Sequence, residues 1–258
     1  MIRLVALDMD NTLLDSRKRL PVDFMDWVRS HPEIKVVIGS GRQYFTLRDN
    51  MQGIEDLILY DAENGALVFD QGVNIYCDAM QKEDILAVLD EMEKIPDTAV
   101  ILCAVQSAYM QHSFPEAEEQ AQIYYHHLIF LEDLRQCPEM GEVVKVTAYF
   151  RNHDSEKWVK GIHLRDSVHP AVSGPDWIDF NNSSVNKGTG IRMIQKKYGI
   201  TREESMAFGD AMNDLEMLQA CEESYAMKNG MEELKKAAKH VTEYSNDEDG
   251  VMRVLRTL

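Results

Sequence analysis

Three short segments of this chain consist almost entirely of apolar residues, and each is followed at once by small or acidic residues. Residues 2–7, 35–38 and 206–208 have this composition, which is typical of strands covered on both faces of a parallel sheet. Segments with apolar residues at helical spacing separate them, as at 22–29 and 186–198. The alternation predicts an α/β fold with a doubly wound, Rossmann-like parallel sheet, whose ligands bind at the carboxyl ends of the strands.

The pattern changes in the middle of the chain. An amphipathic helix is expected first, then two strands, and later a strand, a second helix and two short strands: 82–95, 99–105, 108–112, 143–150, 155–165, 171–172 and 177–180. Helices followed by paired strands are typical of an α+β module. We therefore expect a core formed by residues 1–80 and 183–258, interrupted by an inserted α+β domain at residues 81–182.

The chain is strongly acidic, with 44 Asp and Glu residues against 27 Lys and Arg residues and a formal net charge of −17. This charge excludes nucleic acid and anionic membranes as bulk partners, because both attract positively charged proteins. No segment approaches the ~20 consecutive apolar residues of a membrane span, and residues 1–7 are too short for a signal peptide. We expect a cytoplasmic protein with four free thiols, at Cys77, Cys103, Cys137 and Cys221.

Two acidic residues follow the first predicted strand. Asp8 and Asp10 are two positions apart, so both side chains leave the same face at the carboxyl end of that strand. Such close carboxylates repel each other unless they share a cation or one stays protonated, and Mg²⁺ is the cation that suits oxygen ligands. The alternative is a polar strand end in which Asp10 or Thr12 caps a helix.

A second acidic pair, Asp210 and Asp214, follows the predicted strand at 206–208. Because parallel strands end at the same edge of a sheet, four carboxylates would converge there. Without a metal ion, such a cluster would strongly destabilise the fold. Taken alone, the pair also fits a helix N-terminus, where the helix dipole favours acidic residues.

The remaining candidates are suited to an anion. Ser40 and Gly41 lie between a predicted strand and a helix, where a hydroxyl and backbone N–H groups can bind phosphate, although a plain turn capped by Ser40 has the same sequence. Lys187 precedes a helix, a position that the helix dipole disfavours for a cation, which favours a role in binding phosphate over one in helix stability. Arg42 is a candidate contact for an anionic leaving group or a partner in a surface salt bridge.

Together these elements resemble the haloacid dehalogenase (HAD) superfamily. The segment Asp8-Met9-Asp10-Asn11-Thr12-Leu13-Leu14 is similar to its first motif, and Ser40 and Lys187 occupy its second and third. Its fourth motif is matched by Gly209-Asp210 with Asn213-Asp214. The closer resemblance is to the Cof-like hydrolases with a type IIB (C2B) cap, on three further segments: Asn64-Gly65-Ala66, Ala226-Met227-Lys228-Asn229 and Asp247-Glu248-Asp249-Gly250-Val251. Two departures are Asn11, where Gly is usual, and Gly39-Ser40 in place of Ala-Thr.

This resemblance implies a Mg²⁺-dependent phosphatase that hydrolyses small phosphorylated metabolites, such as sugar phosphates, through an aspartyl-phosphate. Asp8 would be the nucleophile and Asp10 the general acid and base. The metal ligands would be Asp8, Asp10 through its carbonyl, Asp210 and Asp214. The phosphoryl oxygens would be held by Ser40, Gly41, Lys187 and Asn213. The inserted domain would be a cap that sets specificity.

Other readings of the same residues remain open. A phosphomutase of the same fold uses the same groups, and a phospho-accepting signalling receiver also combines clustered Asp, Ser or Thr, and Lys. A non-catalytic regulatory protein that binds phosphate esters is the third alternative. We expect a small phosphorylated metabolite as the partner, and a monomer or a homodimer.

Overall fold

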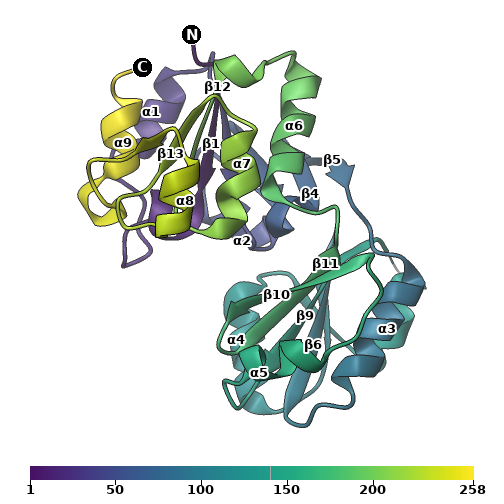
Figure 1. The fold of residues 1–258 in the computed structure, drawn as a ribbon. Coiled ribbons are helices and arrows are strands. Elements are labelled where there is room, and N and C mark those ends of the chain that lie inside the picture. Colours follow the sequence, from purple (N-terminus) through teal and green to yellow (C-terminus); the bar gives the residue numbers. More distant parts are fainter. Residues whose placement is uncertain (140) are drawn as a thin grey trace. The chain divides into compact units, whose positions relative to one another are not determined.

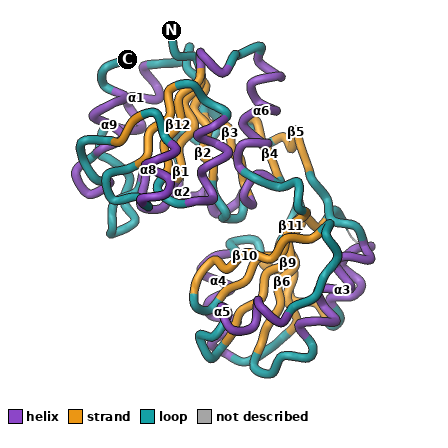
Figure 2. Tube along the Cα trace, in the orientation of Figure 1, coloured by secondary structure: helices purple, strands orange, loops and turns teal. Residues whose placement is uncertain are grey.

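The computed structural model describes residues 1–139 and 141–258. Contacts between residues divide the chain into two compact units. The first combines Met1–Tyr76 with Asn186–Leu258, and the second consists of Cys77–Val185. Each unit contains one sheet with helices and loops around it (Figures 1 and 2). The second unit is thus an insertion in the sequence of the first.

The first unit is built on an eight-stranded sheet in the order β14-β13-β12-β1-β2-β3-β4-β5. From β14 to β3 the neighbouring strands are parallel, and β4 is antiparallel to β3. The strands are β1 Leu4–Asp8, β2 Lys35–Gly39, β3 Ile58–Ala62, β4 Leu67–Asp70, β5 Val73–Cys77, β12 Ser205–Gly209, β13 Glu223–Ala226 and β14 His240–Val241. The central strand β1 is buried along its whole length, as its continuous apolar sequence predicts.

Helices cover both faces of this sheet. They are α1 Phe24–Ser30, α2 Tyr44–Asn50, α6 Lys187–Tyr198, α7 Leu215–Gln219, α8 Glu232–Ala237 and α9 Gly250–Leu255. On one face Ile191 and Ile194 of α6 belong to a buried cluster that includes Ala6 of β1. On the other side α1 and α9 lie together, where the Trp27 indole donates to the Leu255 carbonyl at 3.2 Å. The predicted doubly wound α/β core is confirmed.

The second unit contains a six-stranded sheet in the order β10-β11-β9-β6-β7-β8. Its strands are β6 Thr98–Ala104, β7 Ala108–Gln111, β8 Leu128–Leu131, β9 Val143–Phe150, β10 Val168–Gly174 and β11 Trp177–Asn182, and its helices are α3 Lys82–Met92, α4 Pro115–Tyr124 and α5 Ser155–Trp158. The central pairs β6–β9 and β9–β11 are antiparallel. The unit is therefore of the expected α+β type.

Strand β8 was not predicted, β10 is longer than the expected 171–172, and two helices of the second unit also differ from the sequence prediction. The helix expected over 155–165 ends at Trp158 and continues only as a short 3₁₀ turn to Gly161, after which Ile162 is extended. Helix α4 was not predicted, because the residues it buries are the small Ala117 and Ala121, which give a weak apolar periodicity.

Within residues 1–139 and 141–258, no helix combines the length and the apolar composition needed to cross a membrane.

Candidate active site

Three neighbouring strands of the first unit end at one edge of the sheet. Strand β1 lies between β12 and β2, parallel to both, and Asp8 at its end is in register with Gly39 at the end of β2. Ser40 follows β2 directly, and Asp210 follows β12 directly. The parallel register therefore brings residues from three distant parts of the sequence to one edge, as their positions after apolar runs predict.

Lys187 is the first residue of helix α6, whose N-cap residue Asn186 accepts a hydrogen bond from the Thr189 N–H. The lysine is completely buried, and its ammonium donates to Asp8 Oδ1 at 2.7 Å and to Asp214 Oδ1 at 2.5 Å. Both carboxylates are buried too. Hydrogen bonds between such charged groups are strong, and loss of one partner would leave a buried charge uncompensated.

Burial and neighbouring charges both act on the pKa values of Asp8 and Lys187. Burial, and then the charge of Asp214, raises the pKa of the Asp8 carboxyl to about 8, although Lys187 acts to lower it. Burial disfavours the charged form of Lys187, but the carboxylates of Asp214 and Asp8 outweigh this effect and raise the pKa of the lysine. When both carboxyls are ionised they carry more negative charge than one lysine neutralises, which favours either a bound proton or a further cation.

Asp8, Asp210 and Asp214 form an acidic group in which one carboxylate oxygen of each lies within 4.8 Å of the others. Asp214 Oδ2 accepts hydrogen bonds from the Asp210 N–H at 2.9 Å and the Ala211 N–H at 3.1 Å, so this side chain also fixes the loop that carries Asp210. The Thr12 hydroxyl donates to Asp210 Oδ1 at 3.3 Å. Three clustered carboxylates are a donor set of hard oxygens, and this set fits Mg²⁺.

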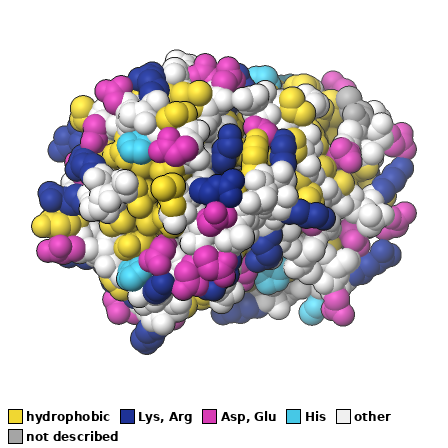
Figure 3. Space-filling model, turned by 90° about the horizontal axis from the view of Figure 1, so that it is seen from above, with side chains coloured by type: hydrophobic (Ala, Val, Ile, Leu, Met, Phe, Trp, Pro, Cys, Tyr) yellow, Lys and Arg dark blue, Asp and Glu magenta, His cyan; other side chains and the backbone are white. Residues whose placement is uncertain are grey.

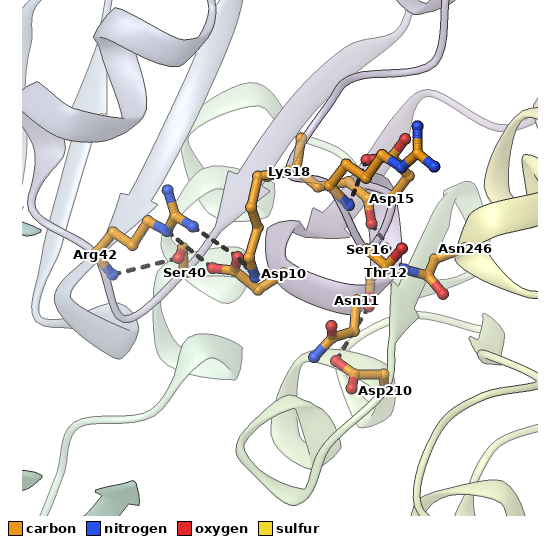
Figure 4. A network of polar contacts seen from close by, with 12 residues as sticks. Asp10, Asn11, Thr12, Asp15, Ser16, Lys18, Ser40, Arg42, Asp210 and Asn246 are labelled. Carbon is orange, nitrogen blue, oxygen red and sulfur yellow. Dashed lines mark hydrogen bonds and ion pairs between the residues drawn. The ribbon is translucent and has the colours of Figure 1, made fainter. Parts of the chain in front are cut away.

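Asp10 has different partners from Asp8. Arg42 donates to both of its oxygens, from Nε to Oδ2 at 2.8 Å and from Nη2 to Oδ1 at 2.6 Å, and Lys18 Nζ donates to Oδ1 at 2.7 Å (Figure 4). Burial opposes ionisation of Asp10, but these hydrogen bonds outweigh it and hold the pKa of the carboxyl below its ordinary value. The Asp10 side chain is not part of the acidic group.

Ser40 and Gly41 form a tight turn between β2 and α2. The Ser40 N–H donates to the Asp61 carbonyl at 3.0 Å, and the Ser40 hydroxyl oxygen accepts from the Arg42 N–H at 3.3 Å. No acceptor for the Ser40 hydroxyl proton is found within residues 1–139 and 141–258, so this proton can be donated to a ligand. A Cβ atom at Gly41 would lie 3.0 Å from the Asn64 amide nitrogen, so a larger residue would disturb this turn.

Asn64 links this turn to the last motif, because the Asn213 amide donates to Asn64 Oδ1 at 3.3 Å. The residue after it, Gly65, has φ +101°, and a Cβ atom there would lie 2.1 Å from the Asn186 carbonyl oxygen. The Asn64-Gly65 turn therefore lies directly against the start of α6. In the sequence this segment is part of the Cof-like resemblance, and its role in joining two motifs becomes visible only in the fold.

The loop that carries Asp10 is held by the C-terminal part of the chain. Within the single turn Met9–Leu13, Asn11 has φ +58°, a left-handed conformation. The Asn229 amide donates to the Asn11 carbonyl at 2.8 Å, and the Asn246 amide donates to the Leu14 carbonyl at 2.9 Å. The segments that contain or adjoin these two asparagines are those that resemble the Cof-like hydrolases, and here they fix the loop that carries Asp10.

Sequence reasoning missed two charged residues near the site. Lys18 lies in an exposed polar loop, where its sequence neighbours give no sign of its bond to Asp10. Asp61 lies in β3, is completely buried, and has no hydrogen-bond partner for either carboxyl oxygen among the described residues. Burial raises the pKa of Asp61 well above its ordinary value, although Lys187 opposes this. A lone Asp within an apolar run was the only signal of this residue.

An aspartate at the end of a central strand, paired with a buried lysine and backed by further carboxylates, is suited to nucleophilic group transfer. A sequence profile of the haloacid dehalogenase-like hydrolases matches residues 5–255. The chain therefore belongs to the haloacid dehalogenase-like hydrolases, as its motifs predict.

Individual proteins support this assignment. The chain is 29% identical to the 5-amino-6-(5-phospho-D-ribitylamino)uracil phosphatase YbjI of Escherichia coli, over 98% of this chain and 95% of that one. The crystal structure of SMU.1108c from Streptococcus mutans matches with a TM-score of 0.86 and 25% identity, over 100% and 98% of the two chains. The HAD subclass IIB sugar phosphatase BT4131 has the same fold, with a TM-score of 0.80 and 23% identity over 99% and 98%. Family and relatives together support an enzyme of the phosphoric monoester hydrolase type.

Proposed function

We propose that this chain is a Mg²⁺-dependent phosphatase that hydrolyses phosphate monoesters of small metabolites through a phosphorylated Asp8. The observation that carries this proposal is the buried contact of Asp8 with Lys187, beside the carboxylates of Asp210 and Asp214. Hydrolysis of phosphate monoesters is among the slowest uncatalysed reactions, so a nucleophile, an acid and several positive charges must act together.

Each residue has a distinct part in the proposed reaction. Asp8 attacks phosphorus and forms a covalent aspartyl-phosphate as the bond between phosphorus and the leaving oxygen breaks, which divides one difficult displacement into two easier ones. Asp10 donates a proton to the leaving oxygen and then takes one from the attacking water. Because Arg42 and Lys18 favour its ionised form, the donating step requires that a substrate group replace part of these contacts. The hydroxyl of Ser40, the backbone at Gly41, the ammonium of Lys187 and the amide of Asn213 hold the phosphoryl oxygens.

Magnesium would be held by carboxylates of the acidic group, with the Asp10 carbonyl as the ligand that the family resemblance implies. When bound, the ion offsets the negative charges of the phosphoryl group and of the nucleophile. Lys187 holds the carboxylates of Asp8 and Asp214, its two hydrogen-bond partners, in place.

The substrate is proposed to be a small phosphorylated metabolite, with the inserted residues 81–182 acting as the cap that selects it. The relative YbjI is named for a compound with a phosphorylated ribityl chain, so polyol and sugar phosphates belong in a first screen. A screen of phosphate release across sugar, polyol and nucleotide monophosphates would identify the class of substrate.

The first prediction tests the mechanism with p-nitrophenyl phosphate. The protein should release phosphate only when Mg²⁺ is present, and Asp8→Asn should reduce the rate by about 10³-fold or more, as loss of a nucleophile does in other enzymes. Asp26→Asn is the matched control, since that side chain is 83% exposed and, among the residues that the structure describes, is bonded only to Arg29. Urea unfolding of both variants checks that they fold. Full activity of Asp8→Asn, or of the unmodified protein in excess chelator, would refute the mechanism.

A further inference from the structure

Two cations converge on the single carboxylate of Asp10. Arg42 binds it through two nitrogens, at 2.6 and 2.8 Å, and Lys18 adds a third hydrogen bond at 2.7 Å. Figure 4 shows Lys18 and Arg42 reaching Asp10 from different segments of the chain. Arg42, Lys18 and Asp10 together have a net charge of +1, in a protein whose net charge is −17.

The two cations are not equivalent. Arg42 forms a bidentate pair with Asp10 and its side chain is only 21% exposed, so it is suited to fix the orientation of that carboxylate. The Lys18 side chain is 56% exposed, and its one hydrogen bond to the described part of the chain is the bond to Asp10. An exposed ion pair of this kind contributes little to stability, and Lys18 can exchange Asp10 for another anion at small cost.

The backbone of Lys18 is nevertheless held in a defined position. Lys18 has φ +61°, an unfavourable conformation for a residue with a side chain. Asp15 stabilises the turn, because its carbonyl accepts from the Lys18 N–H at 2.9 Å and its carboxylate accepts from the N–H groups of Arg17 and Arg19 at 2.9 and 2.8 Å. The loop thus directs a flexible cation toward the group that meets the leaving oxygen.

We propose that Lys18 is a specificity residue that favours phosphate esters whose leaving group carries a second anionic group close to the ester oxygen. This inference rests on the proposed phosphatase function, in which Asp10 contacts the leaving oxygen. Since Lys18 Nζ and that oxygen would both bond the same carboxyl group, the second anion belongs on the carbon that bears the ester or on the next one. A carboxylate and a phosphate both satisfy this requirement.

The test compares two esters that differ only in this anion. The pair is 2-phosphoglycerate, which has a carboxylate on the ester-bearing carbon, and glycerol 2-phosphate, which has a hydroxymethyl group there. Each is measured as a competitor of p-nitrophenyl phosphate hydrolysis. The unmodified protein should bind 2-phosphoglycerate more tightly than glycerol 2-phosphate. Lys18→Gln should reduce this preference, measured as the ratio of the two inhibition constants, about tenfold, which is the change in affinity expected when one ion pair of moderate strength is lost.

Arg17→Gln is the matched control. It removes the same charge from the neighbouring position of the same loop, where the side chain is exposed, and should leave the ratio and the basal rate unchanged. High salt should also reduce the preference of the unmodified protein, since the charges are partly exposed. Equal inhibition by both esters, or none by either, overturns the inference, as does an equal loss for both esters in Lys18→Gln. Absence of any p-nitrophenyl phosphate hydrolysis would instead contradict the phosphatase function itself.

Discussion

Asp61 is a carboxyl group that the proposed chemistry does not use and that the fold does not pair. Both of its oxygens are buried without a hydrogen-bond partner among the described residues, and burial raises its pKa well above 3.8, with Lys187 opposing. The folded protein therefore binds the Asp61 proton more tightly than the unfolded chain does. By linkage, the stability that this proton contributes is complete below the ordinary pKa and is lost as the pH rises toward the folded-state value.

A pH-dependent stability measurement tests this assignment. Asp61→Asn cannot ionise, so its free energy of unfolding should increase relative to the unmodified protein as the pH rises from about 5 to about 8, with a slope of up to about 1.4 kcal/mol per pH unit. Urea unfolding in the presence of chelator measures both proteins. Asp56→Asn, whose side chain is 65% exposed, should show no such divergence. Parallel pH profiles for Asp61→Asn and the unmodified protein would mean that Asp61 is already ionised in the folded state.

Asn11 illustrates a sequence departure that the structure explains. The motif resemblance places Gly where this chain has Asn, and the backbone at this position has φ +58° and ψ +7°. Gly adopts this region without cost, and Asn is one of the few other residues that tolerate it. The substitution therefore keeps the conformation of the loop between Asp10 and Thr12.

At the scale of elements, helix α6 packs unusually closely against its neighbours. A Cβ atom at Gly188 would lie 2.3 Å from the Glu216 carbonyl oxygen, and one at Gly190 would lie 2.0 Å from Asp61 Oδ1. The two glycines let the first turn of the helix approach α7 and β3. This close approach is what brings Lys187, at the start of the helix, to Asp8.

Gly190→Ala is accordingly predicted to destabilise the protein, although Ala favours a helix over Gly by about 1 kcal/mol. We expect a loss of about 1–3 kcal/mol from the steric conflict with Asp61, with lower phosphatase activity as Lys187 is displaced. In the double variant with Asp61→Ala, the loss should be smaller than the sum of the single effects by about 1 kcal/mol or more. Gly161→Ala, with no atom within 4 Å of the new Cβ, is the control. Additive effects of Gly190→Ala and Asp61→Ala on stability would show that the new methyl group does not contact Asp61.

The parts of the site that could be predicted are those that depend on the strands. Asp8 ends an apolar strand, Ser40 and Asp210 each follow one directly, and parallel pairing is enough to bring strand ends together. Lys18 and Asp61 could not be predicted in the same way. The contact of Lys18 with Asp10 depends on the path of an irregular loop, and the isolation of Asp61 depends on the packing of α6. Helix α4 was missed for a comparable reason, since small buried residues leave little periodic signal.

At the scale of the whole molecule, the net charge of −17 opposes capture of an anionic substrate. The face seen in Figure 3 carries acidic side chains interspersed with Lys and Arg, rather than a single basic patch. Attraction of the substrate must therefore come from positive charges close to the site. Lys18, Arg42 and Lys187 supply positive charge at the edge of the sheet, and part of the acidic excess, in Asp8, Asp210 and Asp214, is suited to hold a metal ion.

The two units have separate hydrophobic cores. One buried cluster of the first unit combines α6, α7 and the central strands, while the clusters of the second unit consist of residues between Met80 and Phe180. The tryptophans report on them separately, with Trp27 in the first unit and Trp158 and Trp177 in the second. The acidic group proposed to bind Mg²⁺ belongs entirely to the first unit.

Magnesium should therefore stabilise one unit only. At an ion concentration about 100 times the dissociation constant, binding adds about 2.7 kcal/mol to the state that holds the site. In a Trp158→Phe/Trp177→Phe variant, the urea midpoint reported by Trp27 fluorescence should rise with Mg²⁺. In Trp27→Phe, the urea midpoint reported by the other two tryptophans should not move. A buffer that contains chelator and no added Mg²⁺ gives the baseline for both variants. Equal shifts in the two variants would show that the units unfold as one cooperative body, and no shift in either would contradict the metal site.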